Sequence, residues 1–82
     1  MMNPDTPSSY WQFCELVDKQ HLMNLSFDKY HRYGQTYFNL LYEFRPEIAD
    51  QIRGTKLDPF YKETVAHGVH EFVQQAYDGV MS

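Results

Sequence analysis

Four residues near the end of the chain have the types and the spacing that metal binding requires: Glu63, His67, His70 and Glu71. Side chains three and four residues apart share one face of a helix, so the first three could turn toward one ion. The pattern of two His four apart with a Glu between them is absent, and a metal site also needs supporting hydrogen bonds. We therefore expect these side chains to lie on a solvated helix face, with no metal and no cofactor.

Other catalytic chemistry also lacks its residues. Cys14, the single cysteine, has no identifiable base and falls among the apolar positions Tyr10, Phe13 and Val17, where a thiol packs as a small hydrophobic group. No serine stands in a Gly-x-Ser-x-Gly elbow, and the glycines are too far apart for a phosphate-binding loop. The sequence predicts no catalytic residues and a protein that is not an enzyme.

A first set of candidate binding residues combines amides with an arginine and a tyrosine on one flank of a predicted helix: Arg32, Gln35, Asn39 and Tyr42. Arginine and tyrosine are enriched at the centres of protein interfaces. This flank, together with the last helix, is predicted to bind another protein, and a homodimer is one form of this hypothesis. An exposed ring among Trp11, Tyr42, Tyr61 and Tyr77 would anchor the contact.

The alternative function is binding of a nucleic acid or another anion through the basic residues of 29–56: Lys29, Arg32, Arg45, Arg53 and Lys56. Arg45, Arg53 and Lys56 fall at or just beyond predicted helix ends, where cations also complement the helix dipole. The net charge of −4 at pH 7 disfavours general binding to a phosphate backbone. Nucleic acid is therefore the less favoured partner.

Apolar periodicity predicts an all-α fold, a small bundle of three longer helices and one short helix. The expected ranges are from Ser8 or Ser9 to residues 21–23, then 30–44, 46–53 and from residue 62 or 63 to 77. Ser9 and Gln12 fit a capping box, Ser26 or Asp28 is a candidate cap for the second helix, and Pro46 both ends that helix and starts the third. Within 30–44, Gly34 interrupts the apolar face and predicts the close approach of another helix.

With 82 residues, the chain has room for one core, so we expect a tail at 1–7 and a single helical domain at 8–82. Aromatic residues make up 17% of the sequence and supply a large core area for so short a chain. Phe60 and Tyr61 are expected to fold back as a single turn that plugs this core. A lone cysteine, no basic-then-apolar leader and no long apolar run predict a cytoplasmic protein without a membrane span.

Three short segments resemble a pattern found in small uncharacterised proteins of bacteriophage and prophage genomes: 32–41, 45–50 and 53–61. The shared features are a Gly-Gln that opens an aromatic helix, an Arg-Pro that starts a short helix, and a Gly-Thr before an Asp-Pro-Phe-Tyr ending. The resemblance covers about 30 of the 82 residues and omits both terminal helices. It implies a small factor that acts on a host or viral macromolecule, and no particular activity follows from it.

Overall fold

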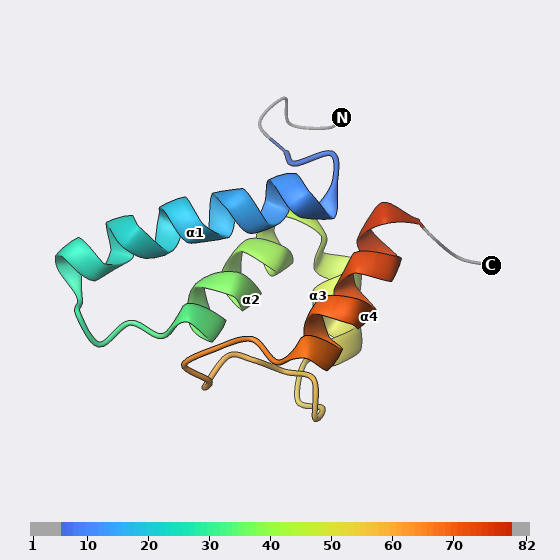
Figure 1. Cartoon of the computed structure of the whole chain (residues 1–82). Coiled ribbons are helices and arrows are strands. Elements are labelled where there is room, and N and C mark those ends of the chain that lie inside the picture. The colour runs from blue at the N-terminus through green and yellow to red at the C-terminus, as the bar shows by residue number, and fades with distance from the viewer. Residues whose placement is uncertain (1–5, 80–82) are drawn as a thin grey trace.

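The structure, a computed structural model, describes residues 6–79, and four α-helices make up most of that part. They are α1 (Tyr10–Phe27), α2 (Tyr33–Phe44), α3 (Pro46–Ile52) and α4 (His67–Asp78). Helix α1 packs on α2 and α4, and α3 packs on the same two helices (Figure 1). No strand occurs within 6–79. The predicted all-α bundle of three longer helices and one short helix is confirmed.

The start of α1 follows the sequence signal, whereas its end does not. The Ser9 hydroxyl accepts a hydrogen bond from the Gln12 backbone N–H at 3.2 Å, as the predicted cap requires. The Gln12 side chain, however, returns to Ser8 rather than Ser9, accepting from its N–H at 3.0 Å and its hydroxyl at 2.9 Å. The helix continues to Phe27, about one turn beyond the predicted end, because polar side chains of this last part bond to α2.

Helix α2 begins at Tyr33, later than predicted, and neither proposed cap serves it. Ser26 lies inside α1, where its hydroxyl donates to the Met23 carbonyl, and Asp28 accepts from the Tyr30 N–H in the turn between the helices. A backbone group replaces the missing side-chain cap: the Gly34 N–H donates to the Lys62 carbonyl oxygen at 3.0 Å. A distant loop therefore completes the first turn of α2.

Gly34 does permit a close approach, but the neighbour is this loop and not a helix. A Cβ atom at Gly34 would lie 1.9 Å from the Pro59 carbonyl oxygen and 2.7 Å from that of Lys62. The Lys62 N–H donates to the Pro59 carbonyl at 2.8 Å, which closes the loop into a turn. Because residues 62–66 belong to this irregular segment, α4 starts at His67 instead of 62.

The short helix α3 matches its prediction to within one residue. Pro46 occupies its first turn, and the chain turns away after Ile52 and Arg53 through Gly54, whose φ of 72° suits glycine. The Asp58 carboxylate accepts from the Gly54 N–H at 2.8 Å, which fixes this turn. At the end of α4, Gly79 likewise adopts a left-handed conformation, directly after the predicted stop.

Aromatic rings from α1, α2 and α4 meet in the core. Phe13 and Tyr37 are fully buried, with ring centroids 5.3 Å apart in an edge-to-face arrangement, and Tyr77 packs against Phe13 at 5.4 Å. The burial of Tyr77 excludes it as the exposed anchor that the sequence suggested. Phe60 only packs on the edge of the core, and Tyr61 is exposed, so the predicted aromatic plug is wrong for Tyr61.

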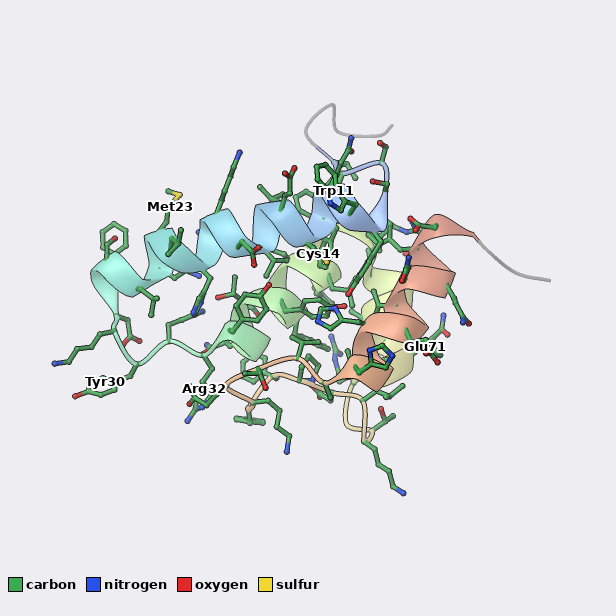
Figure 2. The ribbon with its side chains drawn as sticks, in the orientation of Figure 1. Trp11, Cys14, Met23, Tyr30, Arg32 and Glu71 are labelled. Carbon is green, nitrogen blue, oxygen red and sulfur yellow. The ribbon has the colours of Figure 1, made fainter. Side chains whose placement is uncertain are left out.

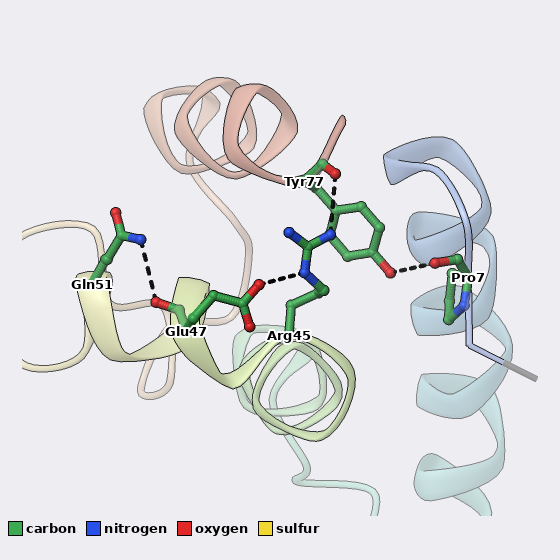
Figure 3. A network of polar contacts seen from close by, with 5 residues as sticks. All are labelled: Pro7, Arg45, Glu47, Gln51 and Tyr77. Atoms are coloured by element: carbon green, nitrogen blue, oxygen red, sulfur yellow. Dashed lines mark hydrogen bonds and ion pairs between the residues drawn. The ribbon is translucent and has the colours of Figure 1, made fainter. Parts of the chain in front are cut away.

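Polar contacts join the N-terminal segment to the other end of the bundle (Figure 3). The Tyr77 hydroxyl donates to the Pro7 carbonyl at 2.8 Å, and the Tyr77 carbonyl accepts from Arg45 at 3.1 Å. Pro7 is buried, so the end of the predicted tail 1–7 belongs to the fold, while residues 1–5 lie outside the described residues. None of the helices within 6–79 is long and apolar enough to span a bilayer.

Candidate binding surface

The four possible metal ligands do not converge. His67 and Glu71 form an exposed pair at 3.5 Å, whereas Glu63 lies 3.8 Å from Arg32 on another part of the surface. Figure 2 shows Glu71 on α4, well to the right of Arg32 at the start of α2. His70 was expected on the solvated face, but it is half-buried against α1 and α2. No group of three or more metal-ligating side chains occurs in the described part of the chain.

His70 instead ends a buried chain of hydroxyl groups. The Tyr37 and Tyr10 hydroxyls are 2.7 Å apart, and the Tyr10 hydroxyl lies 2.5 Å from His70 Nδ1. Burial is the main cause that raises the pKa of both tyrosines. The Tyr37 hydroxyl raises the pKa of Tyr10 further, whereas the hydrogen bond with Tyr10 acts against the rise at Tyr37. Burial, followed by the nearby His67, lowers the pKa of His70. The neutral forms of Tyr37, Tyr10 and His70 are therefore favoured. These three side chains join α2, α1 and α4 as part of the core.

Cys14 lies beside this chain and is partly buried, as its place on the apolar stripe predicts. Burial is the main cause that raises the pKa of its thiol, and the carboxylates of Asp18 and Asp78 act in the same direction. A hydrogen bond with Tyr10 opposes them. The thiolate that nucleophilic catalysis requires is thus disfavoured at Cys14.

The predicted flank of α2 is present as an outward face. Asn39 and Tyr42 are exposed, Gln35 is partly exposed, and Arg32 occupies the N-cap position at the start of the helix. Thr36, which helical spacing places on the same side of α2, is buried, because its hydroxyl accepts from Asn24 of α1 at 3.2 Å and lies 3.3 Å from His21. The face is therefore narrower than predicted on the side of α1.

A groove of about 300 Å³ runs along that narrower side, between α1 and α2. Its lining is mainly polar and comes from both helices: Gln20, Asn24, Thr36, Asn39, Leu40 and Glu43. Asn39 therefore borders both the groove and the outward face of α2.

On the side away from α1, the α2 face continues into a row of four aromatic rings and one arginine that we call the aromatic strip. Its members come from α2 and from the segment after α3, and they are Phe38, Tyr42, Arg53, Phe60 and Tyr61. The Arg53 guanidinium lies over the Tyr42 ring at 4.8 Å and over Phe38 at 5.8 Å. Phe38 contacts Phe60 at 6.0 Å between centroids, and Phe60 contacts Tyr61 at 5.0 Å. The strip thus runs unbroken from α2 to the loop.

Two of the predicted site residues, Tyr42 and Arg53, meet in this strip, although they were predicted in separate groups. Tyr42 is 47% exposed and Tyr61 is 77% exposed, so the strip presents ring faces to solvent. Sequence analysis missed Phe60 as a member because it placed Phe60 and Tyr61 in the core, although it also named Tyr61 among the possible exposed anchors. The Asp58-Pro59 turn that precedes them was the available signal.

The basic residues do not form one patch. Arg45 is held by Glu47 at 2.5 Å and covers the Tyr77 ring at 4.8 Å, which makes it a structural residue (Figure 3). Arg53 pairs with Asp50 at 3.5 Å. The remaining three cations have different neighbours. Lys29 is beside Tyr30, Arg32 is beside Glu63, and Lys56 lines a pocket to which Lys62, Asp58 and Glu63 also contribute.

Comparison of the chain with protein-family models, with curated proteins and with solved structures found no match.

Proposed function

We propose that this protein is a non-catalytic module that binds another protein through the outward face of α2 and the aromatic strip. The observation that carries the proposal is the exposed stack of Arg53 on Tyr42, which joins α2 to the segment after α3. Arginine and tyrosine dominate the binding energy of protein interfaces because they offer large, orientable contact areas. Here Arg53 is already held in place by Asp50 and by the Phe38 ring, and its guanidinium lies over Tyr42. Such preorganisation reduces the entropy lost on binding.

The polar groups beside the strip fit the same role. Gln35 and Asn39 offer amide donors and acceptors on the α2 face, and Arg32 adds a charge at its end. A ring of polar groups around an aromatic centre is the usual arrangement of a protein interface. The face of α4 that the sequence included carries His67 and Glu71 without an exposed ring, so we centre the proposal on α2.

Binding of a nucleic acid is the less favoured function because its affinity depends on several cations that face one strand together. Arg45 is engaged by Glu47 and by the Tyr77 carbonyl, and Arg53 and Arg32 each have an acidic neighbour. Acidic groups next to the arginines oppose the approach of phosphates.

The test is affinity capture from the source cells with the immobilised protein, quantified by mass spectrometry. Tyr42→Ala and Arg53→Ala should each reduce the recovered partner about tenfold, the effect of losing one interface anchor. Tyr30→Ala is the matched control, because Tyr30 is also an exposed ring but lies in the turn after α1. Equal recovery by all four proteins would contradict the proposal.

The alternative is tested with purified DNA and RNA in a salt titration. A steep loss of affinity with rising salt, weakened by Arg53→Ala and unaffected by Tyr42→Ala, would favour nucleic-acid binding. We expect no such association.

A further inference from the structure

The outer side of α1 carries a row of exposed residues at intervals of four: Trp11, Glu15, Lys19 and Met23. Positions four apart form the ridges that fit into grooves when helices pack together. Figure 2 shows Trp11 and Met23 on the side of α1 that faces away from the other helices. The ridge is therefore available to a partner outside this chain.

The ridge is apolar at both ends. Trp11 is 69% exposed and Met23 is 59% exposed, and Leu22, beside Met23, is 70% exposed. No residue of α1 after Val17 is buried, and the inward side there uses polar groups, with Asn24 donating to Thr36. The second half of α1 thus turns polar residues inward and large apolar residues outward, the reverse of a helix that serves only its own core.

Between these apolar ends stand one acid and one base. Glu15 and Lys19 are exposed, and neither forms an ion pair with another described residue. The order along the ridge is therefore apolar, acidic, basic, apolar, and it is symmetric in position about the level of residue 17. Trp11 and Met23 are each about 9 Å from that level, and Glu15 and Lys19 about 3 Å, at 1.5 Å per residue.

We propose that this face of α1 binds the same face of a second copy of the chain, with the two helices antiparallel. A two-fold axis near residue 17 then places Trp11 of each copy against Leu22 and Met23 of the other. The same axis places Glu15 of each copy beside Lys19 of the other. One surface serves both copies, as a two-fold interface requires.

Charge selects the antiparallel arrangement over the parallel one. Parallel helices in register would set Glu15 against Glu15 and Lys19 against Lys19, which is repulsive, whereas the antiparallel pair gives two attractive contacts. Charge also disfavours a lipid surface as the occupant. The ridge is neutral and the chain carries a net charge of −4, while helices that bind membrane surfaces are rich in lysine and arginine.

The area of the face predicts a reversible dimer. A tryptophan contributes about 150–250 Å² when buried, and with two aliphatic side chains the apolar contact of both copies reaches roughly 700 Å². Specific interfaces bury about 1,200–2,000 Å² in total, so this contact needs its polar flanks and remains at the small end of the range. Monomer and dimer should therefore exchange, and the fraction of dimer should rise with protein concentration.

The first test follows association by analytical ultracentrifugation from low micromolar to near-millimolar protein. Trp11 is the single tryptophan, so its fluorescence should shift to shorter wavelength as the dimer forms. Met23→Ser should raise the dissociation constant about tenfold or more and suppress the shift. Tyr30→Ser is the control, since it removes an exposed ring from the turn after α1, outside the ridge and outside the aromatic strip, and should leave association unchanged.

The second test changes only charge. Glu15→Lys and Lys19→Glu should each weaken the dimer, because each single variant creates like-charge contacts across the two-fold axis. The double variant Glu15→Lys with Lys19→Glu restores both attractive contacts and should recover the association of the original chain. Circular dichroism checks that each variant keeps its helical content.

A monomer at every concentration would overturn the proposal, as would a dimer that Met23→Ser leaves intact. A double variant as weak as the single ones would overturn the antiparallel arrangement. A monomer whose Trp11 fluorescence shifts with vesicles of anionic phospholipid would assign the face to a membrane surface instead. These outcomes do not depend on the aromatic strip, so they are independent of the proposed function.

Discussion

Replacing Gly34 by alanine should destabilise the fold even though alanine is the better helix former. The added Cβ atom would lie 1.9 Å from the Pro59 carbonyl oxygen and 2.9 Å from its carbonyl carbon, and both are backbone atoms. A carbon and a carbonyl oxygen in contact lie about 3.3–3.6 Å apart, so the turn at Pro59 must retreat by more than about 1 Å. No side-chain rotation can relieve this contact.

Three effects set the magnitude. Forcing an extra methyl group into a packed site costs about 1–3 kcal/mol. Retreat of the turn also weakens the hydrogen bond from Gly34 to the Lys62 carbonyl, worth about 0.5–1.5 kcal/mol. The better helix propensity of alanine offsets at most about 1 kcal/mol of this loss in stability. The free energy of unfolding should therefore fall by about 1–3 kcal/mol, and the midpoint of thermal unfolding by roughly 5–20 °C.

Gly68→Ala is the matched control, because Gly68 also lies in the first turn of a helix, α4. Its added Cβ would meet only the Leu57 Cδ2 atom, at an ordinary 4.0 Å. This variant should be neutral or more stable by up to about 1 kcal/mol. Urea unfolding followed by circular dichroism measures both variants. If Gly34→Ala is as stable as Gly68→Ala, the turn at Pro59 does not lie against α2, and the reasoning is refuted.

Two further predictions concern the buried hydroxyl chain. Tyr37→Phe leaves the Tyr10 hydroxyl without its Tyr37 partner and should lower the free energy of unfolding in urea by about 1–3 kcal/mol. Tyr42→Phe on the surface should change it by less than about 0.5 kcal/mol, and equal costs would contradict the buried bond. Because burial lowers the pKa of His70 below its ordinary value of 6.5, the folded state favours the neutral ring. This stabilisation is complete above about pH 6.5 and is lost as the pH falls from there through the folded pKa. His70→Gln should therefore flatten the fall in stability below pH 6.5. An unchanged slope in His70→Gln would show that the ring is not held neutral.

The sequence predicted those parts of the fold that depend on neighbouring residues. The cap at Ser9, the helix start at Pro46 and the turns at Gly54 and Gly79 are local signals, and each was found where it was predicted. Each depends on a backbone conformation or hydrogen bond within a few residues, which residue type alone specifies.

Predictions failed where a polar residue has a partner far along the chain. His70 was placed on a solvated face because polar residues usually lie there, but its contact with Tyr10 allows its partial burial. Thr36 is buried in the same way, through its hydrogen bond with Asn24. No pattern within one helix reveals such a partner, because the partner belongs to another helix.

The candidate binding surface, too, could be predicted only in part. The α2 flank from Arg32 to Tyr42 could be predicted, since a helical repeat places its residues together. Its continuation into Arg53 and Tyr61 could not be predicted, because it depends on how the segment after α3 folds back across α2. That path is fixed by the bond from Gly34 to Lys62. Sequence alone thus determined the helices and the apolar content of the core, and tertiary contacts decided which surface they present, since only folding brings distant groups within reach of one another.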